Sequence, residues 1–285
     1  MNLKTLAALC VFSFSTNTFA DVVVKDTDKF QDVAVKVDEL TSKGENPLIV
    51  IDIDNTLLTS TSDIGGDIWY QWQRGKLDVK PTKDEKVHCL FEDSIGMLYE
   101  LMPMKTIEEK VPSTVRGWQD KGLTVIALTS RSPNYRYATE REMYRNHYDM
   151  TISPLKEKGA DKTPVYIDKL DRPLSYINGI MMTTGMNKGT MLKYILDKTN
   201  QKYDEIIFVD DSEKNVVNME NAYKANPEVD MTIFHYTKVE DDRIKANGAV
   251  LTQKQADKMA SDWKQLNAVL KTIAPARSGD TCLGK

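Results

Sequence analysis

Four aspartates lie at the ends of two short apolar runs of this 285-residue chain, two at each run. The run ending IVI leads into Asp52, with Asp54 two residues on, and the run IIFV leads into Asp210 and Asp211. Carboxylates held close together repel each other unless a cation lies between them, and hard oxygen ligands of this kind suit Mg²⁺. One ionised carboxylate beside such a cation can act as a nucleophile, while another carries a proton if its surroundings raise its pKa.

A hydroxyl group and a cation complete the set of candidate residues. A further apolar run ends in Thr129, whose hydroxyl and backbone N–H can bind a phosphoryl oxygen, and Lys188 opens a predicted helix, where an anion is favoured. Alone, each residue has an ordinary explanation as a turn, a helix cap or a surface group. Together, at the ends of three apolar runs, they indicate phosphoryl chemistry. Asn187 and Met182 stand where a P-loop needs glycine, so a P-loop is excluded.

The elements that position these residues follow from the hydrophobic pattern. Short β-branched runs with the length of buried parallel strands cover 47–53, 123–128 and 205–209, with a weaker one at 231–235. Helical patterns lie between and after them, at 30–40, 190–198, 215–224 and 252–273. This alternation predicts an α/β fold with a Rossmann-like parallel sheet sandwiched by helices. Ligands of such sheets bind at the carboxyl ends of the strands, where the four aspartates and Thr129 stand.

Two segments depart from this alternation. Residues 69–121 are mostly helical and are predicted to form a small cap inserted into a core of residues 21–68 and 122–285. Residues 166–185 predict a β-hairpin insertion around the favoured turn Asn178-Gly179. Trp69, Trp72 and Arg74 in the cap are candidates for substrate contact, although packing is the commoner role of aromatic residues at helical spacing. His88, His147 and His235 show no metal-ligand spacing and are expected to be structural or exposed.

The ends and the charge of the chain bear on its compartment and partners. Residues 1–20 have the basic start, short apolar run and small residues of a secretory signal peptide cut after Ala20, which predicts a periplasmic or secreted protein that is not embedded in a membrane. The formal net charge of −4 excludes the strongly basic footprint of a nucleic-acid binder. The mature chain keeps Cys89 and Cys282, for which we expect one disulfide, with two unpaired thiols as the alternative.

The candidate residues, in their order along the chain, resemble the four motifs of the haloacid dehalogenase-like superfamily of phosphohydrolases. Asp52-Ile53-Asp54-Asn55-Thr56 matches the first motif, Thr129 the second, Lys188 the third and Asp210-Asp211 the fourth. The resemblance implies that Asp52 attacks phosphorus to form an aspartyl-phosphate, and that Asp54 protonates the leaving oxygen and then deprotonates water. It also implies that Thr129 and Lys188 hold the phosphoryl oxygens.

The same resemblance implies Mg²⁺ held by Asp52, the backbone carbonyl of Asp54, and Asp210, with Asp211 binding directly or through water. An acid at position 54 favours phosphate esters over dehalogenation. The expected function is a secreted, Mg²⁺-dependent hydrolase of a small phosphomonoester. The alternatives are a non-catalytic binding protein with the same fold and a phosphotransferase using the same aspartyl-phosphate. The substrate and the oligomeric state are left open, and Arg131 is expected either to meet a second anionic group or to pair with a core aspartate.

Overall fold

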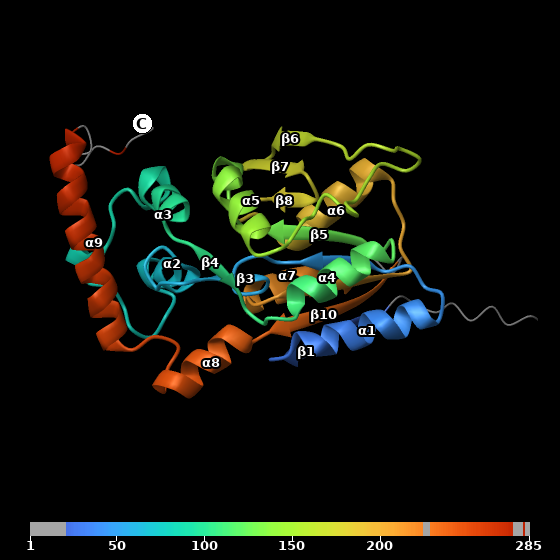
Figure 1. The fold of residues 1–285 in the computed structure, drawn as a ribbon, viewed down its shortest axis with the longest axis horizontal. Coiled ribbons are helices and arrows are strands. Elements are labelled where there is room, and N and C mark those ends of the chain that lie inside the picture. Colours follow the sequence, from blue (N-terminus) through green and yellow to red (C-terminus); the bar gives the residue numbers. More distant parts are fainter. Residues whose placement is uncertain (1–20, 225–228, 276–281, 283–285) are drawn as a thin grey trace, which may run out of the picture.

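The computed structural model describes residues 21–224, 229–275 and 282. At its centre lies an eight-stranded sheet with helices on both faces (Figure 1). In spatial order its strands are β1 (Val22–Thr27), β10 (Asp230–Tyr236), β9 (Glu205–Asp210), β2 (Leu48–Ile51), β5 (Thr124–Thr129), β8 (Ile180–Met182), β7 (Pro173–Ile177) and β6 (Tyr166–Lys169). The first six strands in this spatial order, from β1 through β10, β9, β2 and β5 to β8, run parallel. The next strand, β7, is antiparallel to both of its neighbours.

The predicted α/β fold with a mostly parallel sheet is confirmed. The four apolar runs of the sequence correspond to β2, β5, β9 and β10, and the three central strands are buried on both faces, as parallel strands between helices must be. Ile49 and Ile51 of β2 face one core cluster, whereas Leu48 and Val50 face the other. This alternation follows from the two-residue period of a strand.

The helices divide between the two faces of the sheet. One face is packed by α1 (Phe30–Ser42), α4 (Val111–Asp120) and α5 (Arg136–Arg145). The other face is packed by α6 (Lys188–Thr199) and α7 (Glu213–Lys224). In addition, α8 (Lys238–Asn247) follows β10 and has no buried residue.

A third hydrophobic cluster lies outside the sheet, where α9 runs beside α2 and α3 (Figure 1). It joins α2 (Asp67–Gln73), the π-helical turn η2 (Leu90–Ser94), α3 (Ile95–Leu101) and α9 (Gln253–Ile273). Two tryptophans of α2, Trp69 and Trp72, are fully buried in it, so packing is their role here. The strands β3 (Leu58–Ser60) and β4 (Met104–Thr106) pair antiparallel between this cluster and the sheet, and the short turns are η1 (Lys83–Glu85) and η3 (Pro133–Tyr135).

The predicted boundaries of core and cap, 69–121 and 21–68 with 122–285, remain a prediction. Within the first range, α4 packs on the sheet through Val111, Val115 and Trp118. Within the second, α9 packs on α2 and α3 through Ala256 and Met259. The segment 166–185 holds β6, β7 and β8, of which β8 pairs with β5 and so extends the central sheet.

The turn between β7 and β8 requires its two residues. Asn178 and Gly179 both have positive φ, 54° and 75°, which is the backbone of the preferred two-residue hairpin turn. A Cβ atom on Gly179 would lie 2.3 Å from the carbonyl oxygen of Met150, a distance that no side chain can occupy. Glycine is therefore needed here for space as well as for conformation.

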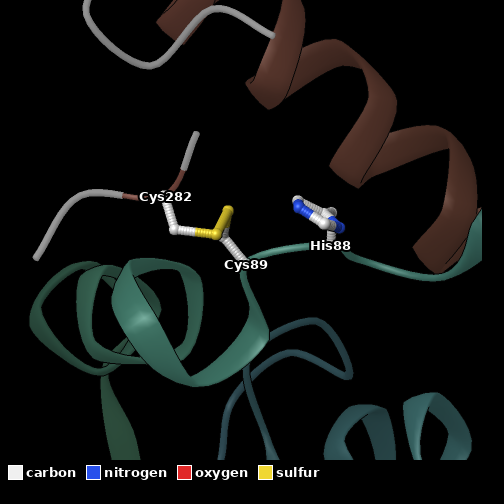
Figure 2. A group of neighbouring side chains, drawn as sticks. All are labelled: His88, Cys89 and Cys282. Carbon is white, nitrogen blue, oxygen red and sulfur yellow. A yellow bond between two sulfur atoms is a disulfide. The ribbon is translucent and has the colours of Figure 1, made fainter. Parts of the chain in front are cut away.

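Cys89 and Cys282 form a disulfide, as the sequence predicts, and it links positions 193 residues apart (Figure 2). His88 lies beside this bond, and one of its ring nitrogens and the two sulfur atoms lie within 4.8 Å of one another. Metal binding by cysteine requires the thiolate. Because both sulfur atoms are bonded to each other, this group is a cross-link and not a metal centre.

The predicted signal peptide, residues 1–20 with its cut after Ala20, lies outside the described residues. Within the described ranges, no helix combines the length and the apolar character that crossing a bilayer needs.

Candidate active site

Three of the candidate residues meet at one edge of the sheet, namely Asp52, Thr129 and Asp210. Asp52 directly follows β2, Asp210 is the last residue of β9, and Thr129 is the last residue of β5. The backbone N–H of Asp52 donates to the carbonyl of Val209 at 2.9 Å, which continues the ladder between β2 and β9 by one residue. Because β5, β2 and β9 are parallel neighbours, their carboxyl ends bring these side chains together.

Lys188 lies between two of the aspartates. Its ammonium nitrogen is 2.7 Å from Asp52 Oδ1 and 2.6 Å from Asp210 Oδ2, and its side chain is completely buried. Burial by itself lowers the pKa of a lysine, but the two carboxylates outweigh it and the pKa of Lys188 lies above its usual value. The ammonium group therefore stays charged in the interior.

The start of α6 fixes this lysine. Lys188 is the first residue of α6, and the side chain of Asn187 caps the helix by accepting from the N–H of Thr190 at 3.1 Å. The next residue, Gly189, packs against α7: a Cβ atom there would lie 2.5 Å from Cβ of Ala222 and 2.9 Å from the carbonyl oxygen of Asn218. The close contact between α6 and α7 at Gly189 thus fixes the position of α6, and with it the position of Lys188 in the site.

Three carboxylates form the group best suited to a metal ion. Oxygen atoms of Asp52, Asp210 and Asp211 lie within 4.8 Å of one another. Asp210 is oriented by the N–H of Ser212 at 2.9 Å and by the side-chain amide of Asn215 at 3.0 Å. An all-oxygen set of carboxylates, held in place by hydrogen bonds, fits a hard divalent cation such as Mg²⁺.

The charges at this edge support a cation. Burial, reinforced by neighbouring negative charges, raises the pKa of Asp52 well above its usual range, although Lys188 opposes the shift. Burial and the charges of Asp67, Asp210 and Asp52 likewise raise the pKa of Asp211. A lysine alone therefore leaves the site with excess negative charge, which a divalent ion would neutralise.

Asp54 is held by an arginine. Nε and Nη2 of Arg131 donate to the two oxygens of Asp54 at 2.8 and 2.7 Å, and Nη1 donates to the hydroxyl of Thr139 at 3.1 Å. The side chain of Arg131 is 3% exposed and that of Asp54 is 22% exposed. Of the two expectations for Arg131, pairing with a core aspartate is thus the one that the structure shows.

Arg131 also contacts the part of the chain that covers this edge. Its guanidinium lies 4.1 Å from the ring centre of Tyr99 in α3, and Tyr99 packs edge-on against Tyr135. A small cavity beside Asp54 is lined by Arg131, Tyr99 and Ser60, among others. The neighbourhood of Asp54 is therefore formed jointly by the sheet edge and by α3.

Thr129 lies at the same edge, with its hydroxyl accepting from the N–H of Arg131 at 3.1 Å. Its carbonyl oxygen accepts from both the N–H and the hydroxyl of Thr183, at 3.0 and 2.9 Å. The strand end is thereby fixed to the segment that leads from β8 into α6. Thr129 is buried, and it adjoins the Arg131–Asp54 pair.

Two further residues, Asp67 and His235, adjoin this site and were not identified as site residues from the sequence. Asp67, the first residue of α2, accepts from the side-chain amides of Asn55 at 3.2 Å and of Gln71 at 2.6 Å. Burial raises the pKa of Asp67 to about 6. His235 Nε2 lies 3.2 Å from the carbonyl oxygen of Asp211. The asparagine beside Asp54 was the available signal for Asp67, and the end of β10 was the signal for His235.

Comparison with known proteins gives two kinds of result. No curated protein matches the chain. Among solved structures, the chain is similar to the structure of the Class C acid phosphatase from Bacillus anthracis at 15% identity and a TM-score of 0.41, and to the crystal structure of that enzyme with tungstate bound at 16% and 0.39. Each alignment covers 82% of this chain and 86% of the other. Residues 26–275 match the family described as "Protein of unknown function (DUF2608)", and the chain belongs to that family.

Proposed function

We propose that this protein is a Mg²⁺-dependent phosphomonoester hydrolase of the haloacid dehalogenase-like type, acting through an aspartyl-phosphate. The observation that carries the proposal is the position of Lys188, whose ammonium nitrogen lies 2.7 Å from Asp52 and 2.6 Å from Asp210 at the carboxyl edge of the sheet. A buried cation beside a potential nucleophile and a metal-type acidic cluster is what a phosphoryl group with three negative oxygens requires.

In the first step an oxygen of Asp52 attacks phosphorus, a P–O bond forms, and the bond from phosphorus to the leaving oxygen breaks. Lys188 and Thr129 lie beside Asp52 and the strand end, where they hold the phosphoryl oxygens as charge moves onto them. Asp54 gives its proton to the leaving oxygen, so the alcohol departs neutral.

In the second step a water molecule attacks the phosphorus of the aspartyl-phosphate, and Asp54 accepts its proton. Phosphate leaves and Asp52 is restored as a carboxylate. The two hydrogen bonds from Arg131 hold the carboxyl group of Asp54 in a fixed orientation for this step. The partial exposure of Asp54 gives protons a route to and from solvent.

The metal would be held by Asp52 and Asp210, by the backbone carbonyl of Asp54, and by Asp211 either directly or through water. When bound, it neutralises charge on the phosphoryl oxygens and lets Asp52 approach them as an anion. Asp67 and His235 adjoin this group through Asn55 and the carbonyl of Asp211, and we assign them a positioning role.

We further propose that α2, α3 and the adjoining α9 act as the cap, because Tyr99 of α3 stacks on the Arg131 that holds Asp54. Periplasmic or secreted localisation is part of the same proposal. The disulfide between Cys89 and Cys282 supports it, since such bonds persist in oxidising compartments. A small phosphorylated compound is the expected substrate.

The proposal is tested by hydrolysis of an aryl phosphate by the mature protein, with Mg²⁺ and with chelator. We expect metal-dependent phosphate release that Asp52→Asn lowers by about 10³-fold or more, as for other nucleophile deletions. Asp168→Asn, at an exposed acid of β6, is the matched control and should retain activity. Addition of an alcohol acceptor separates the phosphotransferase, which would yield a new phosphate ester. Equal rates in the presence of chelator or in Asp52→Asn would contradict the proposal.

A further inference from the structure

Two cations at the C-terminal end of α2 lie against two aromatic rings. Lys76 Nζ lies 5.1 Å from the ring centre of Tyr70, and Arg74 Cζ lies 5.6 Å from that of Phe91, which itself packs edge-on against Tyr70 at 6.1 Å. All these residues belong to α2, its C-terminal end or η2. Together, Tyr70, Phe91, Arg74 and Lys76 form one cationic and aromatic surface.

This surface adjoins the acidic edge through α2. Asp67, one turn before Tyr70, is bonded to Asn55, the residue that follows Asp54. Burial raises the pKa of Tyr70, while the positive charges of Arg74 and of Arg172 oppose that rise. Arg172 comes from a different part of the fold, so the positive charges of two separate elements act on this tyrosine.

The topology explains why Arg172 reaches the same place. It lies in the turn between β6 and β7, and since β7 runs antiparallel to β8, this turn is at the sheet edge where β8 ends. Nη1 of Arg172 donates to the carbonyl oxygen of Thr184 at 3.0 Å, and the N–H of Thr184 donates to the carbonyl oxygen of Arg131 at 3.1 Å. Arg172 is therefore attached to the segment that connects Thr129, Arg131 and Lys188.

Three cations in this region take no part in the ion pairs among the described residues: Arg74, Lys76 and Arg172. Arg131 and Lys188, by contrast, are paired with aspartates. All three are exposed. The chain as a whole has a net charge of −4, so a group of cations without acidic partners is a local exception. Such a group attracts anions to this side of the acidic site.

We propose that Arg74, Lys76 and Arg172 form a subsite for a second anionic group, a carboxylate or a further phosphate, on the leaving part of the substrate. This inference rests on the proposed function and narrows its substrate class to phosphomonoesters that carry two separated anionic groups. The scissile phosphate lies at Lys188, and the rest of the molecule extends past Tyr70 toward the two arginines. Arg172 and Arg74, from two separate elements, select for the second charge.

The test compares phosphate esters of ω-hydroxy acids, in a series of increasing chain length, with the primary amides of the same acids. We expect at least one acid to exceed its amide in kcat/KM, with bisphosphorylated diols showing whether phosphate serves as well as carboxylate. Arg172→Gln and Arg74→Gln should each lower the ratio of acid to amide by about 3- to 10-fold, as expected for one partly solvated charged hydrogen bond. Arg116→Gln, at an exposed arginine of α4 paired with Asp120, is the matched control and should keep the ratio.

Equal kcat/KM for acids and amides at every chain length, or a ratio that survives both substitutions, would overturn the subsite while leaving the proposed function intact. Absence of turnover with every ester would instead contradict the proposed function. In that case, binding to the subsite is measured as the Kd of the non-hydrolysable phosphonate analogues of the same acids and amides. A Kd ratio that favours the acid and falls in Arg172→Gln supports the subsite, and equal Kd values refute it.

Discussion

Arg131 binds both carboxylate oxygens of Asp54, with N–O distances of 2.8 and 2.7 Å. The arginine stands two residues after the end of β5 and the aspartate three residues after the end of β2. The pair therefore joins the carboxyl ends of two adjacent strands. Its guanidinium also lies against Tyr99 of α3. The proposed proton carrier is thus fixed in two directions, by the sheet edge and by the proposed cap.

Replacement of Arg131 by lysine tests this arrangement. Arg131→Lys keeps the positive charge but loses the planar fork, so Asp54 is held by one hydrogen bond and is free to rotate. We expect kcat for an aryl phosphate to fall by about 10- to 100-fold, with the free energy of unfolding lowered by about 1–3 kcal/mol. Arg116→Lys, at an exposed ion pair of α4, should change neither quantity. Unchanged kcat in Arg131→Lys would show that the fork does not position Asp54.

A divalent cation should stabilise the folded protein. Because the acidic cluster exists in the folded state and not in the unfolded chain, binding raises the free energy of unfolding, and with it Tm. The gain grows with the logarithm of the ratio of free ion to Kd and is about 2.7 kcal/mol at a hundredfold excess. We expect a Mg²⁺-dependent rise in Tm that is reduced in Asp211→Asn and unaffected in Asp168→Asn. A rise of the same size in Asp211→Asn would exclude that carboxylate from the metal site. This measurement needs no substrate.

Gly189 offers a test of how Lys188 is positioned. A methyl group at Gly189 has no room between α6 and α7, and overpacking of this kind costs about 1–3 kcal/mol of stability. Gly189→Ala should therefore be destabilising and should also lower kcat, because α6 carries Lys188. Gly117, inside α4 with nothing within 4 Å of its Cβ position, is the matched control. Gly117→Ala should be neutral or stabilising by up to about 1 kcal/mol, so a similar loss in both variants would contradict the packing argument.

The disulfide should contribute strongly to stability. It closes a loop of 193 residues, and removal of such a cross-link costs about 2–4 kcal/mol, because the unfolded chain regains the freedom that the bond removes. We expect the urea midpoint to fall on reduction and in Cys89→Ser with Cys282→Ser. The double variant should then be insensitive to reductant. If reductant lowers the midpoint of the double variant by the same amount, the effect does not arise from this bond.

The central part of the fold is predictable from the sequence because its signals are local. The runs that become β2, β5 and β9 are short, β-branched and continuously apolar, which is the pattern of strands buried on both faces. The start of α6 at Lys188 and the Asn178-Gly179 turn are likewise written in a few adjacent residues. The polar residues at the ends of the strands then meet because parallel neighbours share one edge.

The remainder depends on contacts between distant segments. The edge strand β1 alternates poorly and is recognisable through its pairing with β10, some two hundred residues away. The apolar stripe of α9, with Ala256 and Met259, shows that the helix packs on something, but not that its partners are α2 and α3. Asp67 follows no strand and enters the site through a contact with Asn55. The sequence likewise does not indicate that Arg131 pairs with Asp54, because this contact forms only in the folded chain.

The formation of an acyl phosphate on Asp52 is the most direct test of the proposed mechanism. The mature protein is incubated with an aryl phosphate and Mg²⁺, quenched in acid during turnover, digested and examined by mass spectrometry, with borohydride reduction to mark the acyl phosphate. We expect a modification on the peptide that contains Asp52, absent from Asp52→Asn and from samples with chelator. Turnover by the wild type without any modified Asp52, or with the label on another residue, would contradict it.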